Sequence, residues 1–268
     1  MQKVPNRAPC GALQSVHGGE PVGRVLILLF GLVSYGAFVV AIVYAVGFLA
    51  NAAVPKGIDD GAVQPLVPSL IVNTLLLALF AVQHTIMARP GFKRWWTQFV
   101  PQPMERSIFV LAASLILILL FWQWRPLPTI LWHVESATGR AALWTVFGLG
   151  FALVLYSSFL INHFDLFGLR QVVLHLKGRA YAPVDFQMPP LYRWLRHPLM
   201  LGFLLAFWMT PTMTIGHLLF AALSTAYIFI GIQFEERDLR RTLGENYEQY
   251  RRKTSMIIPR RPKSPDAA

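Results

Sequence analysis

Ionisable and aromatic side chains gather at both ends of a long apolar stretch in the second half of the chain. Residues 199–234 contain no Asp, Glu, Lys or Arg. Arg196-His197-Pro198 stands before this stretch and Glu235-Glu236 follows it. A helical hairpin would bring the two ends to the same side, so we expect a charged pocket at its mouth.

The side chains of this mouth suit a zwitterionic ligand that also carries a planar ring. In chain order they belong to Arg196, His197, Pro198, Glu235, Glu236, Gly244, Tyr247 and Tyr250. Pro198 suits the first turn of a helix. The N–H groups of a helix N-terminus, beside an Arg, attract a carboxylate or phosphate. A Glu could bind an amine or ribose hydroxyls, and Tyr rings could contact a base or a cation.

A structural reading of the same residues carries about equal weight. Glu236 and Arg240 are spaced as an i,i+4 ion pair on one helix. Tyr and Arg side chains also anchor helices at a membrane boundary without binding any ligand.

Two further groups of residues could act on a proton. The string INHFDLFGLR places Asn162, His163, Asp165 and Arg170 within nine residues. His163 and Asp165 could form a base and its orienting acid, although polar residues there could also cap a helix end. His84, beside Gln83, lies near the end of another apolar run. A histidine at membrane depth is costly and indicates function, or else a hydrogen bond between helices.

Long apolar runs must position these groups. The chain is 55% hydrophobic and 14% charged, against about 25% charged residues in soluble domains. Runs long enough to cross a bilayer as helix cover residues 25–50, 66–88, 107–124 and 141–162, and a hairpin over 199–234 turns at 210–216. We therefore expect an all-α integral membrane bundle of five to six transmembrane helices, five if the short first arm of the hairpin does not cross.

The distribution of charge predicts the orientation of this bundle. Residues 89–106 carry four Lys or Arg against one Glu, and residues 163–196 carry five against two acidic residues, whereas residues 210–216 carry none. Because Lys and Arg prefer cytoplasmic loops, we expect both termini and the hairpin mouth in the cytoplasm, in a bacterial inner membrane. We expect an arm over residues 1–24, a transmembrane domain over 25–258 and a disordered tail over 259–268.

Several function classes lack their signatures. No zinc finger or RNA-recognition pattern accompanies the net charge of +11, so no nucleic-acid partner is expected. Without H-E-x-x-H, C-x-x-C or a cluster of histidines, no metal is expected. The Gly-Leu-Gly at residues 148–150 lacks a third glycine, which argues against a dinucleotide fold.

The hairpin motifs resemble a known superfamily. RHPLMLG, followed by EE-x-x-L-x4-G-x-x-Y-x-x-Y, resembles the membrane methyltransferases of the isoprenylcysteine carboxyl and phospholipid methyltransferase type. The resemblance implies an S-adenosylmethionine site over residues 163–258. The matching positions are Arg196, His197, Pro198, Gly202, Glu235, Glu236, Tyr247 and Tyr250. Met200 stands where those families commonly have Tyr, so one aromatic contact is missing.

A longer resemblance covers most of the chain. The strings LFAVQHTIMARPGFKRWW, ERSIFVLAASLILILLFWQWRPLP and FLINHFDLFGLRQV are similar to the methanethiol S-methyltransferase family, itself similar to a denitrification-associated membrane protein family. It implies that methanethiol is methylated by S-adenosylmethionine to dimethyl sulfide, without a metal. Since a thiolate is the nucleophile, a base is needed, and the candidate catalytic residues are His163, Asp165, His84 and Arg170.

Other functions remain open at this point. Methylation of a lipid amine or a prenylated carboxylate would need a lateral opening for a long chain. Sterol reduction with a nicotinamide cofactor is a neighbour by fold resemblance. A transporter or accessory membrane protein is the alternative outside enzymes, although the absence of charged residues in mid-span argues against an ion path. The expected partners are a small thiol and the bilayer, and no protein partner is inferred.

Overall fold

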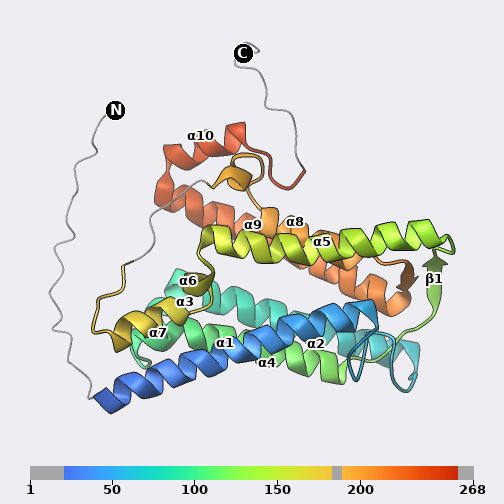
Figure 1. Ribbon diagram of the computed structural model, residues 1–268, viewed down its shortest axis with the longest axis horizontal. Helices are drawn as coiled ribbons and strands as arrows, with labels where there is room; N and C mark the ends of the chain where they lie inside the picture. Colours follow the sequence, from blue (N-terminus) through green and yellow to red (C-terminus); the bar gives the residue numbers. More distant parts are fainter. Residues whose placement is uncertain (1–20, 183–188, 259–268) are drawn as a thin grey trace, which may run out of the picture.

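The computed structural model describes residues 21–182 and 189–258, and its long helices lie side by side in one elongated bundle (Figure 1). Five helices are long and apolar enough to cross a membrane: α1 (Pro21–Ala50), α2 (Leu66–Ala88), α4 (Glu105–Gln123, preceded by η1, Gln102–Met104), α5 (Ala137–Ile161) and α9 (Ile215–Leu243). Many apolar side chains on these helices are exposed, as expected for surfaces that face lipid. The expected all-α integral membrane fold is confirmed.

Shorter elements connect and cover the long helices. They are α3 (Pro90–Trp96), β1 (Ile130–His133), α6 (His163–Leu166), α7 (Leu169–Leu176), η2 (Pro190–Arg193), α8 (Pro198–Trp208), β2 (Thr212–Thr214) and α10 (Glu245–Lys253). The segment between α5 and α8 contains α6, α7 and η2 among its described residues.

The C-terminal hairpin differs from the expected pair of full spans. Helix α8 has 11 residues, which reach about 16 Å at 1.5 Å per residue, about half of a bilayer core. The predicted turn forms β2, which pairs antiparallel with β1. Because β1 precedes α5 and β2 precedes α9, both helices start at the same end of the bundle. The chain must therefore return from the end of α5 to the start of α9 through α8 and an extended segment. The described residues thus contain five full-length helices, as in the alternative with five crossings.

These connections define two ends of the bundle. The ribbon end carries β1 and β2, and the mouth end carries the C-terminus of α5, the start of α8 and α10 (Figure 1). The arm predicted over residues 1–24 is already helical from Pro21, because α1 starts there. The remainder of the arm and the tail predicted over 259–268 lie outside the described residues.

A close helix contact sets the position of α8. Gly202 of α8 faces Gly150 and Val154 of α5: a Cβ added at Gly202 would lie 2.7 Å from the Gly150 carbonyl oxygen and 2.9 Å from the Val154 nitrogen. Only glycine allows the two backbones to approach this closely, as is common between membrane helices. Gly202 thereby helps to fix where the Arg-His-Pro segment lies.

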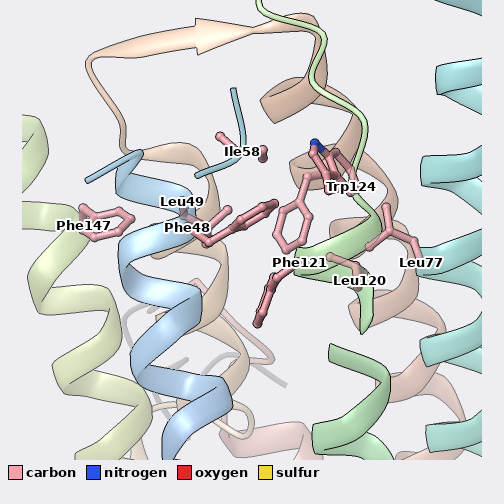
Figure 2. Close-up of a cluster of buried hydrophobic side chains, with 9 residues drawn as sticks. Phe48, Leu49, Ile58, Leu77, Leu120, Phe121, Trp124 and Phe147 are labelled. Carbon is pink, nitrogen blue, oxygen red and sulfur yellow. The ribbon is translucent and has the colours of Figure 1, made fainter. Parts of the chain in front are cut away.

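Aromatic side chains fill the ribbon end. Figure 2 shows side chains from α1, α2, α4, α5 and the loop after α1 converging in one buried cluster: Phe48, Leu49, Ile58, Leu77, Leu120, Phe121, Trp124 and Phe147. Phe48 packs against Phe121 with ring centroids 4.9 Å apart and edge-on against Trp124 at 6.0 Å. This cluster is apolar, so the ionisable groups concentrate at the other end.

Candidate functional site

The residues predicted at the hairpin mouth do come together. The N-terminus of α8 lies against α9, and residues 254–256 run alongside it: Arg196 N–H donates to Ser255 O at 2.8 Å and His197 N–H to Met256 O at 3.1 Å. We call Arg196, His197, Glu235, Glu236, Tyr247, Tyr250 and Arg251 the mouth cluster. Its members come from the two residues just before α8, from the end of α9 and from α10.

Glu236 is the centre of the mouth cluster. Its Oε1 accepts from Arg196 Nε at 2.9 Å and lies 3.1 Å from His197 Nε2, while its Oε2 lies 3.4 Å from Arg251 Nε. The Glu236 side chain is 5% exposed. A buried carboxylate is tolerated when it is paired and hydrogen-bonded, so these contacts stabilise its charge.

Arg196 joins this carboxylate to the C-terminal segment. Its Nη1 donates to Thr254 O at 2.6 Å and to Arg251 O at 3.0 Å. The sequence had suggested that Arg196 receives a ligand carboxylate. In the structure its Nε and Nη1 are instead bound within the protein, to an internal carboxylate and two main-chain carbonyls.

Other members of the mouth cluster are less engaged. The Glu235 side chain is 51% exposed, with Oε2 3.6 Å from His197 Nδ1. Tyr247 is 2% exposed, and among the described residues its buried hydroxyl has no hydrogen-bond partner. Buried polar groups usually have a partner, so the Tyr247 hydroxyl is an exception, and the Glu235 carboxylate is accessible from outside.

The second mouth tyrosine braces the structure. The Tyr250 hydroxyl donates to Tyr192 O at 2.6 Å, and its ring lies 5.9 Å from that of Tyr247. Burial raises the pKa of Tyr250 to about 12 and raises the pKa of Tyr247 still further. Both phenols are therefore neutral hydrogen-bonding groups at neutral pH.

Pro198 and Gly202, two further residues that the sequence predicted for this site, shape the backbone. Pro198 is buried at the first position of α8, where its missing N–H is not needed. Gly202 lies against α5, as described above.

His163 occupies a separate polar site at the start of α6. Its Nε2 lies 2.8 Å from the Tyr35 hydroxyl and its Nδ1 lies 2.8 Å from Ser158 Oγ. The ring stacks on Phe159 with centroids 4.3 Å apart, and the residue is 4% exposed. Burial lowers the pKa of His163 below its ordinary value, so the imidazole is neutral at pH 7.

The hydrogen bonds around His163 indicate its tautomer. Ser158 Oγ donates its single hydrogen to Leu155 O at 2.7 Å, so Nδ1–H of His163 must donate to Ser158. Nε2 is then the acceptor, and the Tyr35 hydroxyl donates to it. A lone pair at Nε2 is what a base requires.

The predicted pairing of His163 with Asp165 is wrong. Asp165 Oδ1 accepts from Arg170 Nη1 at 2.8 Å, and its Oδ2 accepts from the Tyr181 hydroxyl at 3.3 Å. Arg170 also donates to Ala182 O at 3.0 Å. Residues two positions apart on a helix do not face each other, so Asp165 and Arg170 hold the segment near Tyr181, and Ser158 orients the imidazole.

His84 lies between helices rather than beside either site. Its ring contacts Phe109 of α4, with centroids 4.9 Å apart, and Tyr227 of α9, at 6.3 Å. Its buried Nδ1 has no hydrogen-bond partner among the described residues. The hydrogen bond between helices that was the structural alternative is therefore not seen at this nitrogen.

Sequence reasoning missed three residues of these sites. Tyr35 and Ser158 hold His163, and Arg251 contacts Glu236. Tyr35 could have been noticed as a hydroxyl inside an apolar run, but nothing in the sequence joins it to a residue 128 positions away.

Comparison with known proteins places these residues in a family context. The NnrU protein family matches residues 72–256. A methanethiol S-methyltransferase of Mycobacterium tuberculosis is 54% identical over 236 residues, covering 88% of this chain and 97% of that protein. Methanethiol S-methyltransferase 1 of Bradyrhizobium diazoefficiens is 53% identical, covering 90% of this chain and 85% of that protein.

A more distant relative comes from an animal. Nurim of Mus musculus is 31% identical over 186 residues, covering 66% of this chain and 70% of that protein. No solved structure matches the chain.

Proposed function

The chain belongs to the NnrU protein family and to the family of the methanethiol S-methyltransferases that it resembles, and on this premise we propose that it methylates methanethiol with S-adenosylmethionine. The thiol loses its proton, a sulfur–carbon bond forms to the transferred methyl group, and the bond from that methyl to the donor sulfur breaks. The products are dimethyl sulfide, S-adenosylhomocysteine and a proton.

The mouth cluster carries this proposal. When bound, the sulfonium of S-adenosylmethionine supplies an electrophilic methyl group. The half-exposed Glu235 carboxylate suits its amine or ribose hydroxyls, and the unpartnered Tyr247 hydroxyl suits a further polar atom. Arg196, His197 and Glu236 bind one another, so we assign them to holding α8, α9 and the C-terminal segment in place around the ligand.

Our proposed base for the thiol is His163. Its neutral imidazole, with an acceptor at Nε2, matches the need to form a thiolate before methyl transfer. The apolar surroundings, with Phe159 stacked on the ring, exclude water, which favours the reaction of a thiolate with a sulfonium. His84, whose Nδ1 lacks a partner among the described residues, is the alternative base, and Asp165 and Arg170 keep a positioning role.

We further propose that the mouth end faces the cytoplasm in a bacterial inner membrane. The described residues of the predicted basic loops, 89–106, 163–182 and 189–196, lie at that end, and the neutral turn at 210–216 lies at the ribbon end. This follows the preference of Lys and Arg for the cytoplasmic side. The cofactor-binding part is then residues 163–258, inside a transmembrane domain over 25–258.

The proposal is tested by titrating S-adenosylhomocysteine into detergent-purified protein in a calorimeter, and then by measuring dimethyl sulfide in the headspace of assays with methanethiol and S-adenosylmethionine. We expect saturable binding and product formation that needs both substrates. Binding with turnover only on lipid extracts would instead indicate a lipid methyltransferase. Absence of both binding and turnover would indicate a transporter or accessory protein.

A further inference from the structure

A second polar site lies at the mouth end of the bundle. A cavity of about 620 Å³ is lined by the start of α1, by α3, η1 and the start of α4, by the end of α5, by α6 and α7, and by residues 178–181. None of its lining residues belongs to the mouth cluster. The cavity is thus separate from the mouth cluster, although Asp165, to which we assign a positioning role in methyl transfer, lines it.

Positive charge dominates the cavity wall. Arg24, Lys93, Arg106 and Arg179 face two carboxylates, Glu105 and Asp165. Both carboxylates are already paired: Glu105 lies 3.6 Å from Lys93 Nζ, and Asp165 lies 2.8 Å from Arg170 Nη1. Three guanidinium groups remain, and among the described residues no carboxylate lies within 4.0 Å of any of them. The cavity therefore suits an anion.

Buried polar atoms in the wall lack partners. Arg24 Nε, a donor, and Gln171 Oε1, an acceptor, are buried without a hydrogen-bond partner among the described residues. Arg106 Nε donates to Leu166 O at 2.7 Å, which fixes the guanidinium at the cavity. Because such atoms are usually satisfied, the ligand should offer both anionic oxygens and a hydroxyl donor.

The rim of the cavity is apolar and faces the membrane boundary. Ile161, at the end of a helix long enough to cross the membrane, is 45% exposed and lines the cavity with Leu166. Trp95 and Phe99 are exposed on and just after α3, which also contributes Lys93. Aromatic residues of this kind favour the level of lipid headgroups, so the ligand should carry acyl chains beside its anion.

We propose that this cavity binds the headgroup of an anionic phospholipid that carries hydroxyl groups, of the phosphatidylglycerol class. The phosphate lies among Arg24, Arg106 and Arg179, a headgroup hydroxyl donates to Gln171 Oε1, and the acyl chains leave past Ile161. Basic pockets between membrane helices are known to bind such headgroups. The lipid would brace α1, α4 and α7 next to the segment that holds His163.

Native mass spectrometry of the detergent-purified full chain tests the proposal. Phosphatidylglycerol and phosphatidylcholine are added in turn to the wild type and to the double variant Arg24→Gln, Arg179→Gln. We expect the wild type to retain phosphatidylglycerol preferentially. In the double variant, the amount of phosphatidylglycerol retained should fall about tenfold or more, since each cation near an anionic lipid contributes to the binding free energy.

The matched control is Arg252→Gln with Lys253→Gln, which removes the same charge from exposed positions on α10. Its retention of phosphatidylglycerol should stay within about twofold of the wild type. Equal retention by the cavity variant and the wild type, or no preference over phosphatidylcholine, would overturn the proposal. Competition by millimolar glycerol 3-phosphate would assign the site to a soluble phosphate instead. Unchanged binding of S-adenosylhomocysteine by the cavity variant shows that it is folded and keeps the two sites distinct.

Discussion

Two buried histidines near the mouth end have opposite surroundings. His197 lies 3.1 Å from one carboxylate oxygen of Glu236 and 3.6 Å from one of Glu235. Among the described residues, the hydrogen-bond partners of the His163 ring are hydroxyl groups, those of Tyr35 and Ser158, each at 2.8 Å. The same side chain is thus tied into an ionic network in one site and kept as a neutral acceptor in the other.

This difference gives the two histidines different roles: His197 holds the mouth cluster together, and His163 accepts a proton. Burial among apolar and neutral groups favours the uncharged form of the His163 imidazole, whereas the His197 imidazole is held in place by two carboxylates. We therefore expect the mouth cluster to govern ligand binding and folding, and His163 to govern turnover.

The largest expected effect comes from removing the proposed base. His163→Ala should lower turnover of methanethiol by about 10²- to 10⁴-fold, with S-adenosylhomocysteine binding changed less than about twofold. Headspace assays and calorimetry on the same preparation measure both. His133→Ala is the control, because His133 is exposed at the ribbon end. Full activity of His163→Ala would transfer the role of base to His84. The contrast between His197 and His163 would then have no bearing on turnover.

Removing the centre of the mouth cluster should reverse that pattern. Glu236→Ala leaves Arg196 and His197 without their shared carboxylate, and breaking a buried ion pair costs about 3–5 kcal/mol. We expect a large fall in thermal stability in detergent and loss of S-adenosylhomocysteine binding by more than about 100-fold. Glu248→Ala, which loses only partly exposed ion pairs at 3.5 Å and 3.8 Å, should cost about 1 kcal/mol or less. Equal effects of the two changes would show that Glu236 matters no more for stability and ligand binding than Glu248 does.

A smaller effect is expected from moving α8 without touching any charge. Gly202→Ala forces a Cβ against the backbone of Gly150 and Val154, and overpacking costs about 1–3 kcal/mol. Gly148→Ala is the matched control, because nothing lies within 4 Å of its added Cβ, so it should be neutral or stabilising by about 1 kcal/mol. Thermal denaturation measures both. A Gly202→Ala variant as stable as Gly148→Ala would show that the close contact between α5 and α8 does not matter.

The pH dependence should be the mildest effect and should report His163. Its pKa lies below 6.5 because burial disfavours the charged form, so turnover should be level near pH 7 and fall about tenfold per unit below that pKa. The unfolded chain binds this proton more readily than the folded chain, so its contribution to stability is complete above pH 6.5 and is lost as the pH falls. Turnover measured between pH 5 and 8 with a midpoint above 6.5 would contradict the neutral imidazole.

The spans were predictable from the sequence for a simple reason. A helix that faces lipid needs about 20 apolar residues, and such runs are visible without knowing their neighbours. Helix α8 was harder, because the apolar run continues past its 11 residues into an extended segment that contains β2 and pairs with β1. Hydropathy does not distinguish a short helix from a full one when the whole segment is apolar.

The members of the mouth cluster other than Arg251 were also predictable, but the contacts within it were not. Arg196 was expected to face a ligand and instead binds Glu236 and the carbonyls of Arg251 and Thr254. Asp165 was expected beside His163 and binds Arg170. Motifs show which residues are present, whereas side-chain direction depends on helix phase and on groups supplied by other elements.

The sequence by itself determined that this chain is a membrane bundle with its ionisable groups concentrated at one end, because the cost of placing charge in lipid shows in composition and spacing. The tertiary structure alone decided what surrounds each imidazole. The partner of His163 Nε2 lies 128 positions away on α1, and the carboxylate beside His197 Nε2 lies 39 positions away on α9. A proton responds to the charges and hydroxyl groups that packing brings within about 3 Å, and the order of residues along the chain does not specify them.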